Sequence, residues 1–263
     1  MKTFFIMKSE AIYLYFRILL NLSFRNMKVR YRQAVIGVLW AALKPTITVL
    51  IFLVVFKFII KMNIKTGISY ELYLLSGIIP WFFFSQTFND MVLSMLDNPN
   101  FISKISISKT IIPLSYLMVN CIELSFSLLV YILISIFLFG ENISLYFMLA
   151  LFLLIVFSFT ISLSFSVLIV FYRDIKHIIP IILQAGIFLS PIAYPISLVP
   201  ERFLYLYFLN PITGIIEIFR FFLIEGYYVQ IDYLIISLIS GSVLSLISIS
   251  VYNKFKNRLA ELI

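Results

Sequence analysis

The amino-acid sequence predicts an all-α membrane protein with about six transmembrane helices, an N-terminal amphipathic interface helix, and re-entrant helices between spans five and six. The composition, the lengths of the apolar runs and the placement of the basic residues support this fold class. Hydrophobic residues make up 62% of the 263 residues and charged residues only 12%. A soluble domain carries roughly 45–50% apolar and about 25% charged residues. The chain has too few charges to cover a surface in water, so we expect lipid to surround it.

The apolar runs have the length that a bilayer requires. The hydrocarbon core is about 30 Å thick, and an α-helix crosses it in roughly 20 residues. Six runs approach or exceed that length: 35–60, 70–95, 111–139, 144–171, 178–194 and 233–251. We therefore expect one six-span transmembrane domain over residues 35–253, with a cytoplasmic tail at 254–263.

Residues 1–34 form a separate N-terminal segment with two contrasting faces. At helical spacing, one face is basic and the other apolar. The basic face carries Arg17, Arg25, Lys28 and Arg32, and the apolar face carries Ile12, Phe16, Leu19, Leu20 and Met27. Such a helix lies along the membrane surface. A cleaved signal peptide is disfavoured, because arginines interrupt the apolar run.

The basic residues indicate the orientation. Of the 20 Lys and Arg residues, 14 fall in the N-terminal segment, the second and fourth connections and the C-terminal tail, whereas five fall on the other side. Because short cytoplasmic loops collect Lys and Arg, we expect both termini in the cytoplasm and an even number of crossings. The net charge of +8 is thus interpreted as a topology signal, and no nucleic-acid partner is expected.

Residues 195–230 differ from ordinary spans. Pro195, Pro200 and Pro211 interrupt the segment, and charged residues alternate with aromatic ones. Short helices that dip into the outer side of the membrane and return fit this pattern, provided that protein or water covers their backbone. Glu217 and Arg220 lie three residues apart on one helical face, where we expect them to brace that helix with each other or across a dimer.

No enzymatic site is expected in this chain, nor any cofactor or metal. No glycine precedes a lysine, which excludes a phosphate-binding loop, and there is one cysteine, Cys121, and one histidine, His177. Asp90 and Glu123 lie within apolar runs, where charge is costly. They could serve a proton relay or face a channel, but an interfacial or interhelical hydrogen bond is the favoured interpretation.

The polar connection at 97–109 carries a stronger signal. Asn98 followed by Pro99 is typical of a helix cap and first turn. Beyond it, Phe101, Ile102 and Ile105 accompany Lys104 on a cytoplasmic loop and would need a partner to cover their apolar side chains. The alternative is a plain connector between two spans.

Distinctive blocks of the sequence lie at residues 31–45, 77–85, 98–104 with Pro113 beyond, 172–175, 190–195 with 199–202, and 209–220. They include Gly77-Ile78-Ile79-Pro80-Trp81 and Asn210-Pro211-Ile212-Thr213-Gly214. In this order the blocks resemble ABC type-2 transport permeases that export polysaccharides, and most closely the O-antigen branch, with capsule and teichoic-acid exporters nearby.

The resemblance implies the permease subunit of an ATP-driven exporter in the cytoplasmic (inner) membrane that moves a lipid-linked polysaccharide. It implies a homodimer of this chain with two copies of a separate nucleotide-binding subunit that carries ATP and magnesium. A drug or small-lipid exporter of the same class is the alternative. A glycosyltransferase or a proton-coupled transporter is disfavoured, because neither an acidic cluster nor an internal repeat is present.

The same resemblance implies a role for three groups of residues. The residues expected to couple to the ATPase are Asn98, Pro99, Phe101, Ile102, Lys104 and Ile105. The aromatic candidates for the channel lining are Phe52, Phe56, Phe188 and Tyr194, although lipid-facing or core packing is the favoured interpretation of these side chains. The residues expected in the outer gate are Pro195, Pro200, Glu217 and Arg220.

Overall fold

The computed structural model describes residues 2–32, 34–61, 68–99 and 108–259, and these ranges contain helices and connections but no strand. The expected all-helical fold class is therefore confirmed. The main elements are α1 (Lys2–Arg30), α2 (Trp40–Phe52) with the π-helical turn η2 (Leu53–Ile59), α3 (Tyr70–Asp97), α5 (Ile111–Ile134) with η3 (Ser135–Phe139), α6 (Phe147–Phe171), α7 (Ile175–Phe188), α8 (Glu201–Phe208), α9 (Pro211–Leu223) and α10 (Ile231–Phe255).

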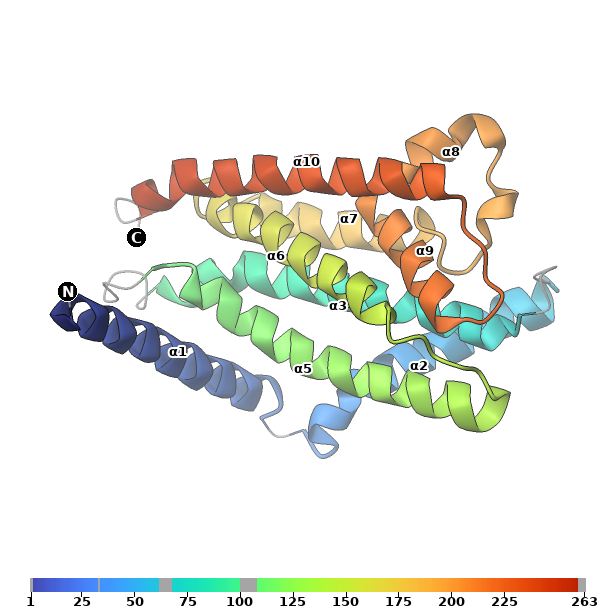
Figure 1. Cartoon of the computed structure of the whole chain (residues 1–263), viewed down its shortest axis with the longest axis horizontal. Helices are drawn as coiled ribbons and strands as arrows, with labels where there is room; N and C mark the ends of the chain where they lie inside the picture. Colours follow the sequence, from blue (N-terminus) through green and yellow to red (C-terminus); the bar gives the residue numbers. More distant parts are fainter. Residues whose placement is uncertain (1, 33, 62–67, 100–107, 260–263) are drawn as a thin grey trace.

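The long helices form a bundle around α3 (Figure 1). This helix contacts α2, α5, α6, α7 and α9. Eighteen of its 28 residues are buried. The start of α1 and the end of α10 lie at one end of the bundle, and α8 and the end of α9 lie toward the other (Figure 1). The expectation that both termini lie on the cytoplasmic side of the membrane stays a prediction.

Within the described residues, four helices are long and apolar enough to cross a membrane, and the bent pair α8–α9 would make a fifth. The four are Trp40–Ile59, Ile111–Phe139, Phe147–Phe171 and Ile231–Arg258. Helix α3 is as long but carries Glu71, Asp90 and Asp97. Of these acids, Glu71 and Asp97 lie in the first and last turns of the helix, and Asp90 is largely buried. The chain is thus a multi-pass membrane protein, and the number of six crossings remains a prediction.

The expected fifth run is shorter as a helix than as an apolar stretch. Helix α7 ends at Phe188, and the chain then leaves helical geometry. Side chains of α3 hold this non-helical stretch, because Tyr70 donates a hydrogen bond to the carbonyl of Ala193 and Tyr73 donates one to that of Tyr194, at 2.6 and 2.9 Å. Hydropathy alone could not reveal this break, since the residues beyond it are also apolar.

Helices α8 and α9 meet at a 99° bend, as expected for the proline-rich segment. Asn210 fixes the bend. Its side-chain oxygen accepts a hydrogen bond from the backbone N–H of Ile212 at 3.2 Å, and Pro211 occupies the first turn of α9. Both features favour a helix start, because the first backbone N–H groups of a helix have no partner within it.

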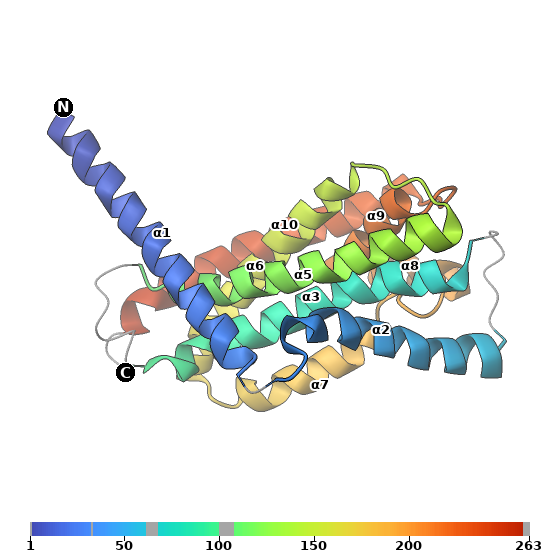
Figure 2. The same cartoon turned by 90° about the horizontal axis from the view of Figure 1, so that it is seen from below.

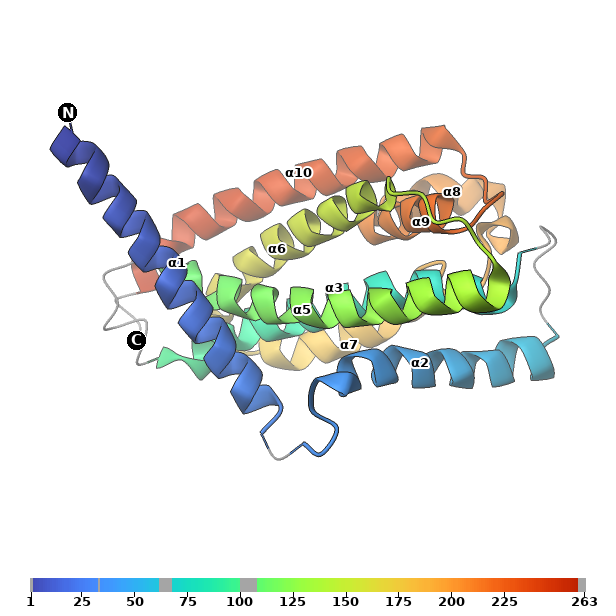
Figure 3. The same cartoon turned by 60° about the horizontal axis from the view of Figure 1, so that its bottom comes forward.

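Helix α1 crosses the bundle at an angle and lies against α5 (Figures 2 and 3). Its contact face carries Leu19, Leu22, Ser23 and Asn26, which are all buried. The apolar face expected from the sequence is therefore divided, because Leu19 lies inward. Ile12, Phe16 and Leu20 remain exposed on another side of the helix.

Candidate functional site

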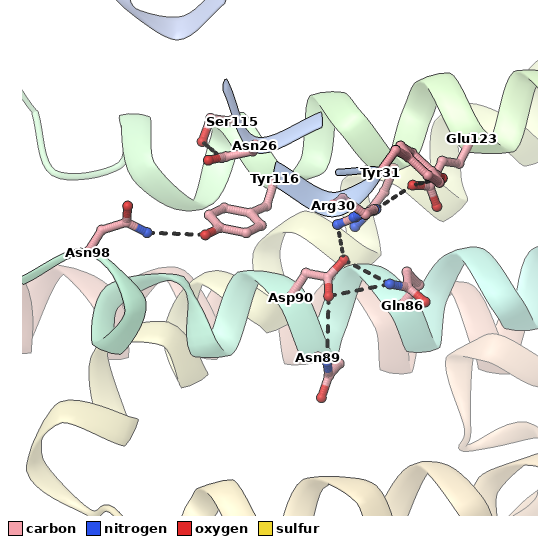
Figure 4. A network of polar contacts seen from close by, with 11 residues as sticks. Asn26, Arg30, Tyr31, Gln86, Asn89, Asp90, Asn98, Ser115, Tyr116 and Glu123 are labelled. Carbon is pink, nitrogen blue, oxygen red and sulfur yellow. Dashed lines mark hydrogen bonds and ion pairs between the residues drawn. The ribbon is translucent and has the colours of Figure 1, made fainter. Parts of the chain in front are cut away.

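Arg30, the last residue of α1, joins three helices at one ionic cluster (Figure 4). Its guanidinium lies 2.5 Å from a carboxylate oxygen of Asp90 on α3 and 2.5 Å from one of Glu123 on α5. The Tyr31 hydroxyl also donates to Glu123, at 2.6 Å. The two acids found within apolar runs are therefore paired between helices. This agrees with the favoured interpretation and accounts for both without a proton relay.

The cluster is largely shielded from solvent, since the side chains of Arg30, Asp90 and Glu123 are 19%, 14% and 16% exposed. Burial lowers the pKa of Arg30, but the two carboxylates more than offset this and raise it overall. Burial, together with the hydrogen bond to Glu123, raises the pKa of Tyr31 well above its ordinary value. Both groups therefore keep their protons at physiological pH, so the contacts of Arg30 and Tyr31 with the carboxylates do not change with pH in that range.

A second set of hydrogen bonds fastens α1 nearer the end of α3. Asn26 donates to the hydroxyl of Ser115 at 2.9 Å, and Arg25 donates to the side-chain oxygen of Asn98 at 2.6 Å. Asn98 also donates to the Tyr116 hydroxyl at 3.1 Å (Figure 4). With both clusters in place, α1 cannot move along α3 and α5 without breaking buried polar contacts.

Asn98 thus ends α3 and connects it to α1 and α5. Its side-chain oxygen is engaged by Arg25, so in the described part of the chain it acts as a joint between helices. Pro99 is exposed immediately after it. The remaining residues expected to couple to the ATPase, Phe101, Ile102, Lys104 and Ile105, lie outside the described residues. The joint lies directly beside the connection in which they occur.

At the opposite end, Arg220 and Glu217 of α9 form a fully buried ion pair. Their side chains are 0% and 2% exposed, and the guanidinium lies 2.7 Å from the carboxylate. Of the two arrangements expected for these residues, the structure shows the pair within one helix. The second carboxylate oxygen of Glu217 accepts a hydrogen bond from the Tyr227 hydroxyl at 2.6 Å.

Three further features hold the Arg220 guanidinium. Its carbon lies 3.6 Å from the centre of the Tyr73 ring, so the cation stacks on an aromatic face. It also donates to the carbonyl of Ile192 at 3.1 Å. Gly77 leaves the necessary room, because a Cβ atom there would lie 2.6 Å from the guanidinium nitrogen. The pair therefore ties α9 to α3 and to the stretch after α7.

Beside this ion pair lies a cavity of about 850 Å³. Residues from α3, α8 and α9 line it, together with Ile60, Tyr233 and the segments 195–199 and 227–230. Pro195 and Glu217 of the expected outer gate are among them, whereas Pro200 is exposed at the start of α8. The volume falls within the range of roughly 300–1,000 Å³ that is usual for ligand sites.

The aromatic candidates for the channel lining fall into two pairs. Phe52 and Phe56 are half-buried neighbours with ring centres 5.7 Å apart. Phe188 is 60% exposed at the end of α7, and the Tyr194 hydroxyl donates to its carbonyl at 2.8 Å. The sequence did not single out Arg30, Tyr73 or Tyr227. The isolated acids in apolar runs, Asp90 and Glu123, could have indicated a nearby cation such as Arg30, because a buried carboxylate needs a cation or a hydrogen-bond donor.

The described residues contain no group of three or more His, Cys, Asp or Glu side chains suited to hold a metal ion. Their charged side chains instead fasten helices together at the two ends of an apolar bundle. This arrangement defines a multi-pass helical membrane protein.

Comparison with known proteins identifies the family. Residues 18–224 match the model of the ABC-2 type transporter family, and the chain belongs to that family as a transport permease subunit. It is 28% identical over 261 residues to the O-antigen export system permease protein RfbA of Klebsiella pneumoniae, covering 98% of each chain. It is 25% identical to a protein of the same name from Myxococcus xanthus, over 73% of this chain and 74% of that one. It is 28% identical to the polysialic acid transport protein KpsM of Escherichia coli, over 81% of this chain and 84% of that one.

Proposed function

We propose that this chain is the membrane subunit of an ATP-driven exporter that moves a lipid-linked, O-antigen-like polysaccharide across the cytoplasmic membrane. The named relatives support the substrate class, since the RfbA proteins and KpsM are described as polysaccharide export or transport proteins. Membership of the ABC-2 family implies an ABC ATPase as the partner.

The observation that carries the proposal is the joint of α1, α3 and α5. Arg30 pairs with Asp90 and Glu123, and Arg25 bonds to Asn98 beside the connection expected to contact the ATPase. A push on that connection would reach three helices together, because buried charged contacts resist separation. This is the mechanical requirement for a membrane subunit driven by a separate motor, with ATP and magnesium bound on the partner.

The functional unit is proposed to be a homodimer with both termini in the cytoplasm. Large apolar side chains on α2, η2 and α7 stay exposed in the single chain, among them Leu50, Ile51, Phe58, Ile181 and Phe188. In a dimer, part of this surface would be covered by the second copy, with the glycan path between the copies.

The proposal is tested by expressing the chain with and without its cognate ATPase in cells that make the lipid-linked glycan. We expect surface glycan only with both proteins, and no ATP hydrolysis by the purified permease alone. Arg30→Gln should leave ATP hydrolysis by the assembled complex measurable but reduce export. Arg32→Gln, an exposed arginine two residues further on, is the matched control. Hydrolysis by the isolated chain, or export of drugs or small lipids without any glycan, would refute the proposal.

A further inference from the structure

We propose that the cavity beside Glu217 is a binding site for a neutral glycan at the outer end of the permease. This inference rests on the proposed function and adds to it the charge class of the sugar. The inference is based on one cavity of about 850 Å³ in which tyrosine rings lie together with the carboxylates of Glu201 and Glu217.

Aromatic rings supply the apolar part of the site. Five of the lining residues are aromatic: Tyr73, Phe208, Tyr227, Tyr228 and Tyr233. Three of these rings already have one face occupied, since Arg220 covers Tyr73, and Phe208 and Tyr233 stack on each other with ring centres 5.0 Å apart. Tyr228 is 80% exposed and Tyr227 half-buried, so their rings can meet the C–H face of a sugar.

The polar part of the site consists of hydrogen-bond acceptors held in place. Glu217 accepts one hydrogen bond at each carboxylate oxygen, from Arg220 and Tyr227. Because the Glu217 side chain is only 2% exposed, it serves to orient the Tyr227 hydroxyl, and the exposed Glu201 supplies the carboxylate that can accept from hydroxyl donors of a ligand. The Tyr227 oxygen can accept a further hydrogen bond, and Gln230 adds an amide that both donates and accepts.

The charges select against anionic ligands. No Lys or Arg is among the described residues that line the cavity, whereas Glu201 and Glu217 are. The one buried cation nearby, Arg220, is 0% exposed and is engaged by Glu217 and the Tyr73 ring. A sialic acid or a phosphate group in the cavity would therefore lie near carboxylates without a free cation, and like charges within one site repel each other. Neutral hexoses, which donate hydroxyl hydrogens, fit the same lining.

The experiment measures protection of a cysteine in the cavity by free sugars. The assembled permease–ATPase complex, in a Cys121→Ala background, carries either Ser197→Cys, an exposed lining position that leaves the tyrosine rings in place, or the control Tyr146→Cys. Tyr146 is 74% exposed and precedes α6 outside the cavity. A membrane-impermeant maleimide is added from outside with neutral gluco-, manno- and galacto-tetrasaccharides, or with tetrasialic acid.

We expect at least one neutral tetrasaccharide to slow labelling at position 197 by about threefold at twice its dissociation constant. Labelling at position 146 should not change, and tetrasialic acid should protect neither position. The inference is overturned if no neutral sugar protects position 197, if tetrasialic acid protects it equally, or if both positions are protected alike. Because labelling requires no transport, a chain that exports glycan without protection refutes the cavity site alone. Protection without ATP-dependent export refutes the proposed function alone.

Discussion

The ion pair of Arg220 and Glu217 allows a quantitative test of what holds the outer end together. Replacing Arg220 by Gln removes the cation from a carboxylate that is 2% exposed and leaves Glu217 only the hydrogen bond from Tyr227. Breaking a buried pair on one side costs about 3–5 kcal/mol, because an uncompensated charge remains. This figure includes the loss of the guanidinium stacked on Tyr73, a contact worth roughly 2 kcal/mol when desolvated.

The assay is unfolding of the purified chain by sodium dodecyl sulfate in mixed micelles, followed by circular dichroism. Arg220→Gln should lower the free energy of unfolding by about 3–5 kcal/mol. The exposed Arg202→Gln should change it by no more than about 0.5 kcal/mol. In the double variant Glu217→Gln/Arg220→Gln no charge remains buried, so its loss should be smaller than the sum of the two single losses by about 1–3 kcal/mol. Additive losses, or a loss below about 1 kcal/mol for Arg220→Gln, would show that the pair does not act as a buried unit.

Four other outcomes are expected. Gly77→Ala should destabilise the chain by about 1–3 kcal/mol, because its Cβ would meet a guanidinium that has no room to move, and an unchanged unfolding curve would contradict this. Asp90→Asn and Glu123→Gln should each cost roughly 1.5–3 kcal/mol through the lost charged hydrogen bond to Arg30, and equal stability would show that α1 is not held there. Reporter fusions after Ile263 and after Gly67 should report opposite sides of the membrane, and the same side for both would refute the orientation. In the Cys121→Ala background, Pro200→Cys should react with an external thiol reagent faster than Tyr207→Cys. Position 200 is exposed, whereas position 207 is half-buried, and its native hydroxyl is hydrogen-bonded to that of Tyr194. Labelling of either only after the cytoplasmic face is opened would refute an outer location.

The acids in apolar runs show which contacts of the candidate sites could be predicted from the sequence. Their cost in lipid predicted that Asp90 and Glu123 have hydrogen-bond partners, and the structure confirms this. Their shared partner could not be predicted, since Arg30 is 60 and 93 residues away and one of several arginines on α1. The pairing of Glu217 with Arg220 could be predicted from the sequence, because residues three apart share a helical face. The contact between Tyr73 and Arg220 could not be predicted, because Tyr73 lies 147 residues away on α3.

The sequence by itself determined that lipid surrounds this protein, that its elements are helices, and that the proline-rich segment is broken into short helices. Those properties follow from composition and local spacing. It did not determine which apolar faces lie inside. Phe147–Phe171 and Ile231–Arg258 have similar mean hydropathies of 2.5 and 2.3, yet 56% of the first window and 11% of the second are buried. In lipid an apolar side chain is as well solvated outside as inside, so hydrophobicity cannot choose the inward face. Only the tertiary structure decided it, through close packing and through the few polar groups that need partners.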